Sequence, residues 1–190
     1  DEHDEHDEHD EHDEHDEHAH GVHDPHAWLS PENAKVWLSL IAGKLSSVDP
    51  TNATTYFSNA TDGQKEITAL ISEINTILLP VRGRNFIVFH DAYQYFETTF
   101  NFPASGAISL SDASDPSPSR IREIQKRIKD EEITCVLAES QFNDKLVETV
   151  VKDAPANRGV IDPLGLGLET GPELYSKLLL NMANTLVKCL

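Results

Sequence analysis

Residues 85–100 read "NFIVFHDAYQYFETTF", a pattern in which a strand gives way directly to a helix. After Asn85, residues 86–89 form a short run of β-branched and aromatic side chains, which is typical of a buried strand. Three similar units follow. The predicted strands are 85–89, 106–110, 133–139 and 158–162, and the predicted helices are 91–100, 117–131, 143–153 and 171–190. This alternation predicts an α/β fold, with a parallel four-stranded sheet and helices on both of its faces.

Two more helices are predicted before the sheet. Ser30 and Pro31 favour the first turn of a helix, and apolar residues recur at helical spacing from there to residue 47. A second apolar stripe runs from Asp49 to Pro80. A helix of that span would be about 40 Å long at 1.5 Å per residue. Because this length exceeds the width of a small lobe, we interpret the helix as a strut between two lobes.

Negative charge is concentrated at the start of the chain. The 190 residues carry a formal net charge of −18, and six Asp-Glu-His units in residues 1–18 supply twelve of the 33 carboxylates. Since these units offer nothing apolar to bury, we expect residues 1–23 to be disordered. No basic patch points to nucleic acid as a partner, and no apolar run approaches the roughly 18 residues of a membrane span. A start inside a repeat, without a signal peptide, favours a fragment or a processed piece.

Three residues are candidate metal ligands. His90 and Asp162 follow predicted strands, so both should lie at the carboxyl edge of the sheet, where ligands gather in such folds. His26 lies in "DPHAWLSP", the first stretch with apolar anchors after the repeat. Each has an ordinary structural explanation when taken alone, since Asp-Pro begins turns and many strands end at a histidine that binds nothing. Together, two histidines and a carboxylate match a zinc site with one open position.

The chain has two cysteines, Cys135 in a predicted buried strand and Cys189 in the last helical turn. They could be two unrelated buried thiols. They could instead form a disulfide that ties the last helix to the sheet, which would indicate an oxidising compartment. The residues alone leave both possibilities open.

Four motifs in this sequence resemble a known family when taken together. They are "DPHAWLSPENA" (24–34), "FIVFHDAYQYFE" (86–97), "CVLAESQF" (135–142) and "VIDPLG" (160–165), and an acidic, histidine-rich stretch directly precedes the first. In order and spacing they are similar to the zinc-specific periplasmic binding proteins of high-affinity zinc ABC transporters. The resemblance covers residues 20–190 and leaves the chain N-terminally incomplete.

The resemblance implies two α/β lobes with zinc held between them. The corresponding division of this chain is a disordered loop in 1–23, a remnant of the N-terminal lobe in 24–47, an interlobe helix in 48–80 and the C-terminal lobe in 81–190. His26 then matches the ligand from the N-terminal lobe, and His90 and Asp162 match ligands from the C-terminal lobe. The family's first histidine ligand has no counterpart in this sequence, so we expect weaker zinc binding than in a full-length member.

Two further features follow from the resemblance. The family pairs cysteines at the positions of Cys135 and Cys189, which favours the disulfide. Manganese-binding relatives have a carboxylate in place of His90, and an imidazole there shifts the preference toward zinc. The implied function is high-affinity capture of Zn²⁺ in the periplasm by a monomer, and delivery of the ion to the membrane permease of an ABC transporter.

The repeat has two interpretations. Each unit offers one imidazole and two carboxylates, so it can serve as an auxiliary, low-affinity zinc collector or sensor, or it can be an acidic solubilising tail. Ordering a disordered tail around an ion costs entropy, so its affinity should be modest. The auxiliary ligands would be His3, His6, His9, His12, His15, His18, His20 and His23. Of these, His20 and His23 lie between the repeat and the folded protein and could serve either part.

Two alternatives to transport stay open at this point. One is a free-standing zinc buffer or adhesin. The other is a zinc hydrolase that uses the same three candidate ligands, although no HExxH or GxSxG motif supports an enzyme. Glu139 is the one additional acid in a suggestive place, and we interpret it as a carboxylate of a turn or helix start.

Overall fold

The structure, a computed structural model, describes residues 24–109, 116–152 and 154–190. The disorder predicted for residues 1–23 lies outside this part of the chain. Among the described residues, no helix is both long and apolar enough to cross a membrane.

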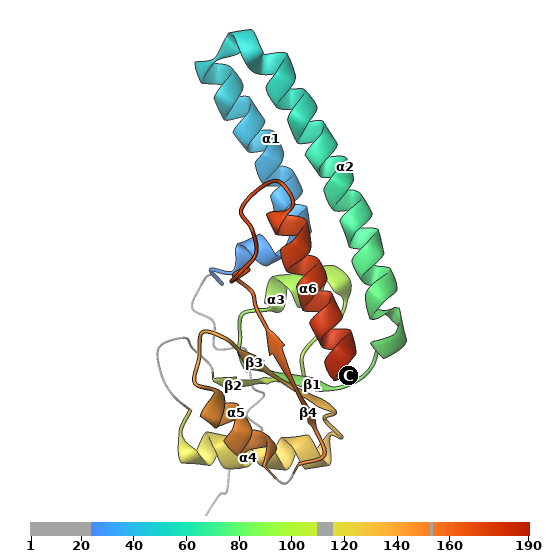
Figure 1. The fold of residues 1–190 in the computed structure, drawn as a ribbon, viewed down its shortest axis with the longest axis vertical. Coiled ribbons are helices and arrows are strands. Elements are labelled where there is room, and N and C mark those ends of the chain that lie inside the picture. Colours follow the sequence, from blue (N-terminus) through green and yellow to red (C-terminus); the bar gives the residue numbers. More distant parts are fainter. Residues whose placement is uncertain (1–23, 110–115, 153) are drawn as a thin grey trace, which may run out of the picture.

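The predicted parallel sheet is confirmed (Figure 1). Its strands are β1 (Phe86–His90), β2 (Ala107–Ser109), β3 (Cys135–Glu139) and β4 (Asn157–Ile161). They lie in the order β2-β1-β3-β4, and each pairs with its neighbour in parallel. The chain therefore moves outward from β1 to β2 and then crosses back to β3 on the other side of β1. This reversal of direction between β1 and β3 is the position where ligands bind in open α/β sheets.

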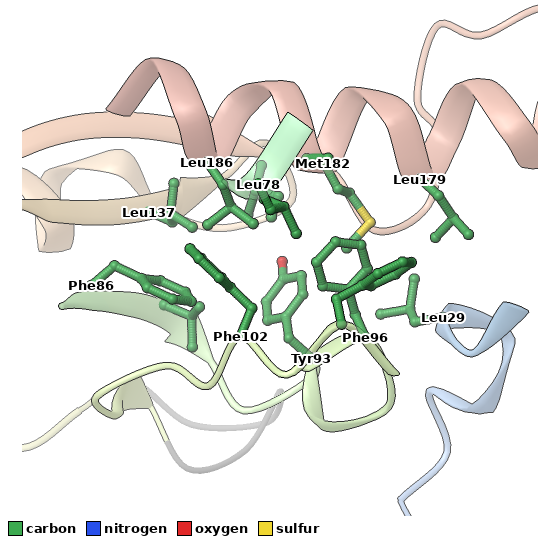
Figure 2. Close-up of a cluster of buried hydrophobic side chains, with 14 of the residues drawn as sticks. Leu29, Leu78, Phe86, Tyr93, Phe96, Phe102, Leu137, Leu179, Met182 and Leu186 are labelled. Carbon is green, nitrogen blue, oxygen red and sulfur yellow. The ribbon is translucent and has the colours of Figure 1, made fainter. Parts of the chain in front are cut away.

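Helices cover both faces of the sheet, as predicted. Because side chains alternate along a strand, Phe86 and Leu137 point into a core formed with α3 (Gln94–Phe100) and α6 (Leu174–Cys189) (Figure 2). Ile87 and Val136 point to the opposite face. There they pack against α4 (Pro118–Asp130) and α5 (Asp144–Val151).

The two helices before the sheet form an antiparallel pair that extends away from it (Figure 1). The first, α1 (Pro31–Val48), begins at Ser30, whose Oγ accepts a hydrogen bond from the Asn33 amide at 3.2 Å. The second, α2 (Ala53–Leu78), has 26 residues and is flanked by short 3₁₀ turns at Pro50–Asn52 and Leu79–Val81. The end of α2 nearer the sheet packs against α6. Its role as a strut between two lobes stays a prediction.

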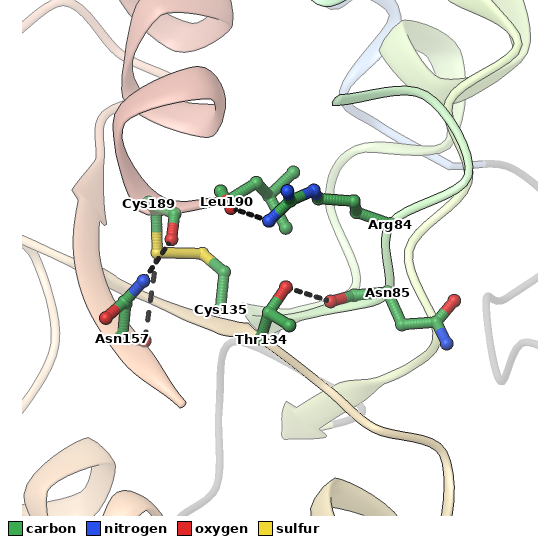
Figure 3. The surroundings of a disulfide bond; sticks show 7 residues. All are labelled: Arg84, Asn85, Thr134, Cys135, Asn157, Cys189 and Leu190. Atoms are coloured by element: carbon green, nitrogen blue, oxygen red, sulfur yellow. Dashed lines mark hydrogen bonds between the residues drawn. A yellow bond between two sulfur atoms is a disulfide. The ribbon is translucent and has the colours of Figure 1, made fainter. Parts of the chain in front are cut away.

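The disulfide between Cys135 and Cys189 is present, so this prediction is confirmed (Figure 3). It joins the first residue of β3 to the last residue of α6. A glycine in β4 allows the helix to come this close, because a Cβ at Gly159 would lie 3.2 Å from the Cys189 sulfur and 2.8 Å from a methyl of Leu137. The Asn157 side chain donates to the Cys189 carbonyl at 2.8 Å and closes the same corner.

Candidate metal centre

Two candidate residues occupy the point of the sheet where the chain reverses direction. His90 is the last residue of β1 and Glu139 is the last residue of the neighbouring β3. The His90 Nδ1 and Glu139 Oε1 atoms are 2.6 Å apart, and the two side chains are only 6% and 1% exposed. Our interpretation of Glu139 as a turn or helix-start carboxylate is therefore wrong, because it ends a buried strand and holds an imidazole.

His26 has a similar partner, which the sequence reasoning missed. Its Nδ1 lies 2.8 Å from Oδ1 of Asp24, and its backbone amide donates to the same oxygen at 2.9 Å. The Asp24 side chain is 3% exposed. The only signal in the sequence was the spacing, since a carboxylate two residues away can fold back onto the backbone and side chain of the residue it precedes.

Each of these contacts fixes one ring nitrogen of a histidine. When the neutral ring donates its Nδ1 proton to a carboxylate, the lone pair is on Nε2, which is the nitrogen that can ligate a metal. Histidines that bind metals in proteins almost always have such a partner, which sets both the tautomer and the orientation of the ring. His26 and His90 both have this arrangement, although they lie 64 residues apart in the sequence.

The distance between the two rings also suits zinc. The ring centroids of His26 and His90 are 5.4 Å apart, and the rings meet edge to face. With a Zn–N bond of about 2 Å and about 1 Å more to the ring centre, two imidazoles at a tetrahedral angle would have centroids about 5 Å apart. Both histidines line one pocket of about 200 Å³ with Glu139, Trp28 and Phe142.

The surroundings of the two rings are acidic. In the described part of the chain, Asp24 Oδ2 and Glu139 Oε2 are buried without a hydrogen-bond partner, as is the Tyr93 hydroxyl. Burial, and then the nearby Glu139 carboxylate, raises the pKa of Tyr93 well above its ordinary value. No lysine or arginine is among the residues that line the pocket. A divalent cation between the imidazoles would therefore be attracted by two buried carboxylates.

Asp162 lies beside this pocket. It directly follows β4, and the next residue, Pro163, lines the pocket. Its Oδ1 accepts from the amides of Leu164 and Gly165 at 3.0 and 3.1 Å, and from the Gln141 side chain at 3.2 Å. Asp162 as the third ligand therefore stays a prediction.

The described residues contain no group of three or more His, Cys, Asp and Glu side chains placed to hold a metal ion. The eight histidines before residue 24, His3 to His23, lie outside these residues, and their auxiliary role stays a prediction.

Comparison with known proteins gives a consistent result. The family described as "Zinc-uptake complex component A periplasmic" (ZnuA) matches residues 1–189. The chain is 46% identical over 167 residues to the high-affinity zinc uptake system protein ZnuA of Brucella abortus, covering 88% of this chain and 50% of that protein. The chain thus spans about half the length of the curated relatives that it matches.

Solved structures share the fold. A crystal structure of ZnuA superimposes with a TM-score of 0.77 at 30% identity, covering 90% of this chain and 61% of that one. The laminin-binding protein of Streptococcus agalactiae, described as having adhesin and metal transporting activity, gives a TM-score of 0.77 at 27% identity over 88% of this chain and 65% of its own. With a family match over nearly its whole length, this chain belongs to the ZnuA family of periplasmic zinc-uptake components.

Proposed function

We propose that this chain captures Zn²⁺ in the periplasm and delivers it to the permease of an ABC transporter. The observation that carries the proposal is the pair of buried imidazoles at the carboxyl edge of the sheet, each held by its own carboxylate. Their spacing suits tetrahedral zinc, and nitrogen ligands favour zinc over the harder cations that prefer oxygen.

In this proposal the ion is cargo and undergoes no chemistry. His26 and His90 bind it through Nε2, and Asp162 supplies a carboxylate oxygen from the rim. Asp24 and Glu139 keep the rings oriented, so little conformational entropy is lost when zinc binds. The ZnuA family consists of uptake components and not of enzymes, so the zinc hydrolase is no longer an alternative.

The histidine repeat is proposed as an auxiliary collector that raises the local concentration of zinc near the cleft. Its imidazoles and carboxylates are the correct kind of ligand, and in the sequence it ends eight residues before His26. The permease and the monomeric state are likewise part of the proposal.

The decisive experiment separates zinc binding in the cleft, meaning the pocket lined by His26 and His90, from zinc binding by the histidines before residue 24. A variant in which the eight histidines before residue 24 are replaced by asparagine keeps the acidic tail but removes its imidazoles. This variant should still bind one zinc ion in a competition titration with a chelator. X-ray absorption at the zinc edge should show two imidazole ligands. Adding His26→Gln or His90→Gln should abolish this binding, and Asp162→Asn should weaken it.

A different result would favour the zinc buffer or adhesin. In that alternative the tail holds the metal, so the asparagine variant would lose all zinc binding and His90→Gln would have no effect. Transport is then tested in cells. The intact gene should restore growth of an uptake-deficient strain under zinc starvation, and the His90→Gln gene should not. Restoration by both genes would contradict uptake through this cleft.

A further inference from the structure

The turn next to His26 is short and lies outside the sheet. It is a single 3₁₀ turn, Ala27–Leu29, which follows His26 and leads directly into α1. It belongs to no strand, unlike His90, which pairs with Ser109 and ends a strand that lies between β2 and β3. Leu29 is fully buried and anchors the end of the turn in the main core. Asp24 orients the imidazole within its own segment, so the position of this segment relative to the sheet depends on a contact with another element.

Trp28 supplies that contact. Its indole Nε1–H donates to the carbonyl of Pro163 at 3.0 Å, across 135 positions in the sequence. Its own carbonyl accepts from the Tyr175 hydroxyl, at the start of α6, at 3.0 Å. The residue is therefore held on two sides by elements that follow β4. These two hydrogen bonds hold the turn Ala27–Leu29 against the segment after β4 and the start of α6.

The acceptor of the indole bond lies next to the predicted third ligand. Pro163 directly follows Asp162, whose Oδ1 accepts from the Leu164 and Gly165 amides and so closes the turn on itself. Gly165 has a φ of 75°, which glycine adopts without strain. The turn of Asp162 is thus a preformed unit, and the indole hydrogen bond links it to the turn of His26.

Trp28 also touches the imidazole directly. The two ring centroids are 5.3 Å apart, and the indole lines the same pocket as His26 and His90. The indole also lines an apolar pocket of about 310 Å³ with residues of α1, α2 and the start of α6. The indole therefore borders both the candidate metal centre and this apolar space.

We infer that Trp28 is a positioning residue for zinc capture, because its indole hydrogen bond to Pro163 holds the His26 ring in register with the turn of Asp162. The inference rests on the proposed function but concerns a different group of atoms. Trp28 touches no metal, and it acts through the orientation of His26. The interaction that matters is the hydrogen bond donated by the indole N–H, whereas the ring itself only lines the pocket.

The test uses Trp28→Phe, which keeps an aromatic wall and removes the donor. The control is Trp37→Phe, since Trp37 lies on α1 at 40% exposure and lines only the apolar pocket. Both changes are made in the full chain that carries asparagine in place of the repeat histidines. Trp28→Phe should weaken zinc binding by about fivefold, the value of one typical hydrogen bond, and Trp37→Phe should leave it unchanged.

A second readout needs no metal. In zinc-free protein, the side-chain NMR signals of His26 should shift or broaden in Trp28→Phe, while those of His90, held by Glu139, should stay in place. Because a merely structural role would move both histidines and lower the melting temperature, this pattern is specific to positioning. Tyr175→Phe removes the second bond and should give the same selective change, which keeps the test valid if Trp28→Phe does not fold.

Two results would overturn the inference. One is unchanged His26 signals in both variants. The other is an equal disturbance of both histidines together with a lower melting temperature. If the parent protein bound no zinc in the cleft, the proposed function would fail, but the metal-free NMR comparison would still decide whether Trp28 positions His26.

Discussion

Reducing the disulfide should lower the stability of the domain without disturbing the candidate metal centre. The bond between Cys135 and Cys189 closes a loop with a sequence separation of 54. On the chain-entropy estimate, a crosslink of that span stabilises the native state by about 4 kcal/mol, because it removes conformations from the unfolded chain. This is a large share of the free energy of unfolding of a typical domain, which is about 5–15 kcal/mol. The reduced protein should therefore unfold much more readily than the oxidised one.

The position of the bond explains why zinc binding should survive. Cys135 begins β3 and Glu139, which holds His90, ends it. Four residues of strand at about 3.3 Å each separate the two ends by about 13 Å. Reduction leaves both sulfurs in the core and creates no cavity, so the sheet edge should keep its geometry as long as the chain is folded.

The assay is urea denaturation of the zinc-free protein with and without a reductant. The midpoint should fall by an amount equivalent to about 4 kcal/mol, and zinc affinity measured well below the midpoint should change by less than about twofold. The same reductant added to the Cys135→Ala, Cys189→Ala double variant is the control, and it should have no effect. A loss of stability below about 1 kcal/mol would refute the loop-closure reasoning. A tenfold loss of zinc affinity would refute the separation between the bond and the metal centre.

Two further predictions concern single carboxylates. Glu139→Gln should weaken zinc binding by about 10- to 100-fold, because an amide orients the His90 ring less firmly than a carboxylate does. The control is Glu73→Gln, since Glu73 is exposed. Equal zinc affinities of the two variants in a chelator competition would contradict the orienting role. Asp49 should titrate below its ordinary pKa of 3.8, chiefly because the Asn52 side chain donates to it at 2.7 Å. The contribution of the Asp49 carboxylate to the stability of the folded state should be complete above pH 3.8 and be lost as the pH falls through the lowered pKa. In an NMR titration Asn52→Ala should move the pKa back toward 3.8, and a wild-type pKa at or above that value would contradict the hydrogen-bond explanation.

Much of the fold was accessible from local patterns. Strands and helices were predicted within a few residues of their observed bounds, because apolar runs and helical periodicity are properties of short segments. Alternation of the two, with the rule that parallel strands need crossover helices, was enough for a parallel sheet covered on both faces. The order β2-β1-β3-β4 was not predicted, since it depends on which strands meet in space.

The site shows the same division. Positions after predicted strands identified His90 and Asp162 as candidate ligands, and the apolar anchors beside it identified His26. The resemblance indicated the pairing of Cys135 with Cys189 before it was observed. These are statements about which residues occur and in what order along the chain. Their chemistry is carried by each residue and can be recognised without coordinates.

The partners of those residues became visible only in three dimensions. The sequence places Glu139 49 residues from His90 and Trp28 135 residues from Pro163, and no periodicity links such positions. Glu139 meets His90 because β1 and β3 are neighbours in the sheet, and Trp28 meets Pro163 because the chain leaving β4 passes beside the first turn before α6 begins. A ligand can be recognised by its own side chain, whereas the groups that orient it are selected by strand order and packing, which are properties of the whole folded chain.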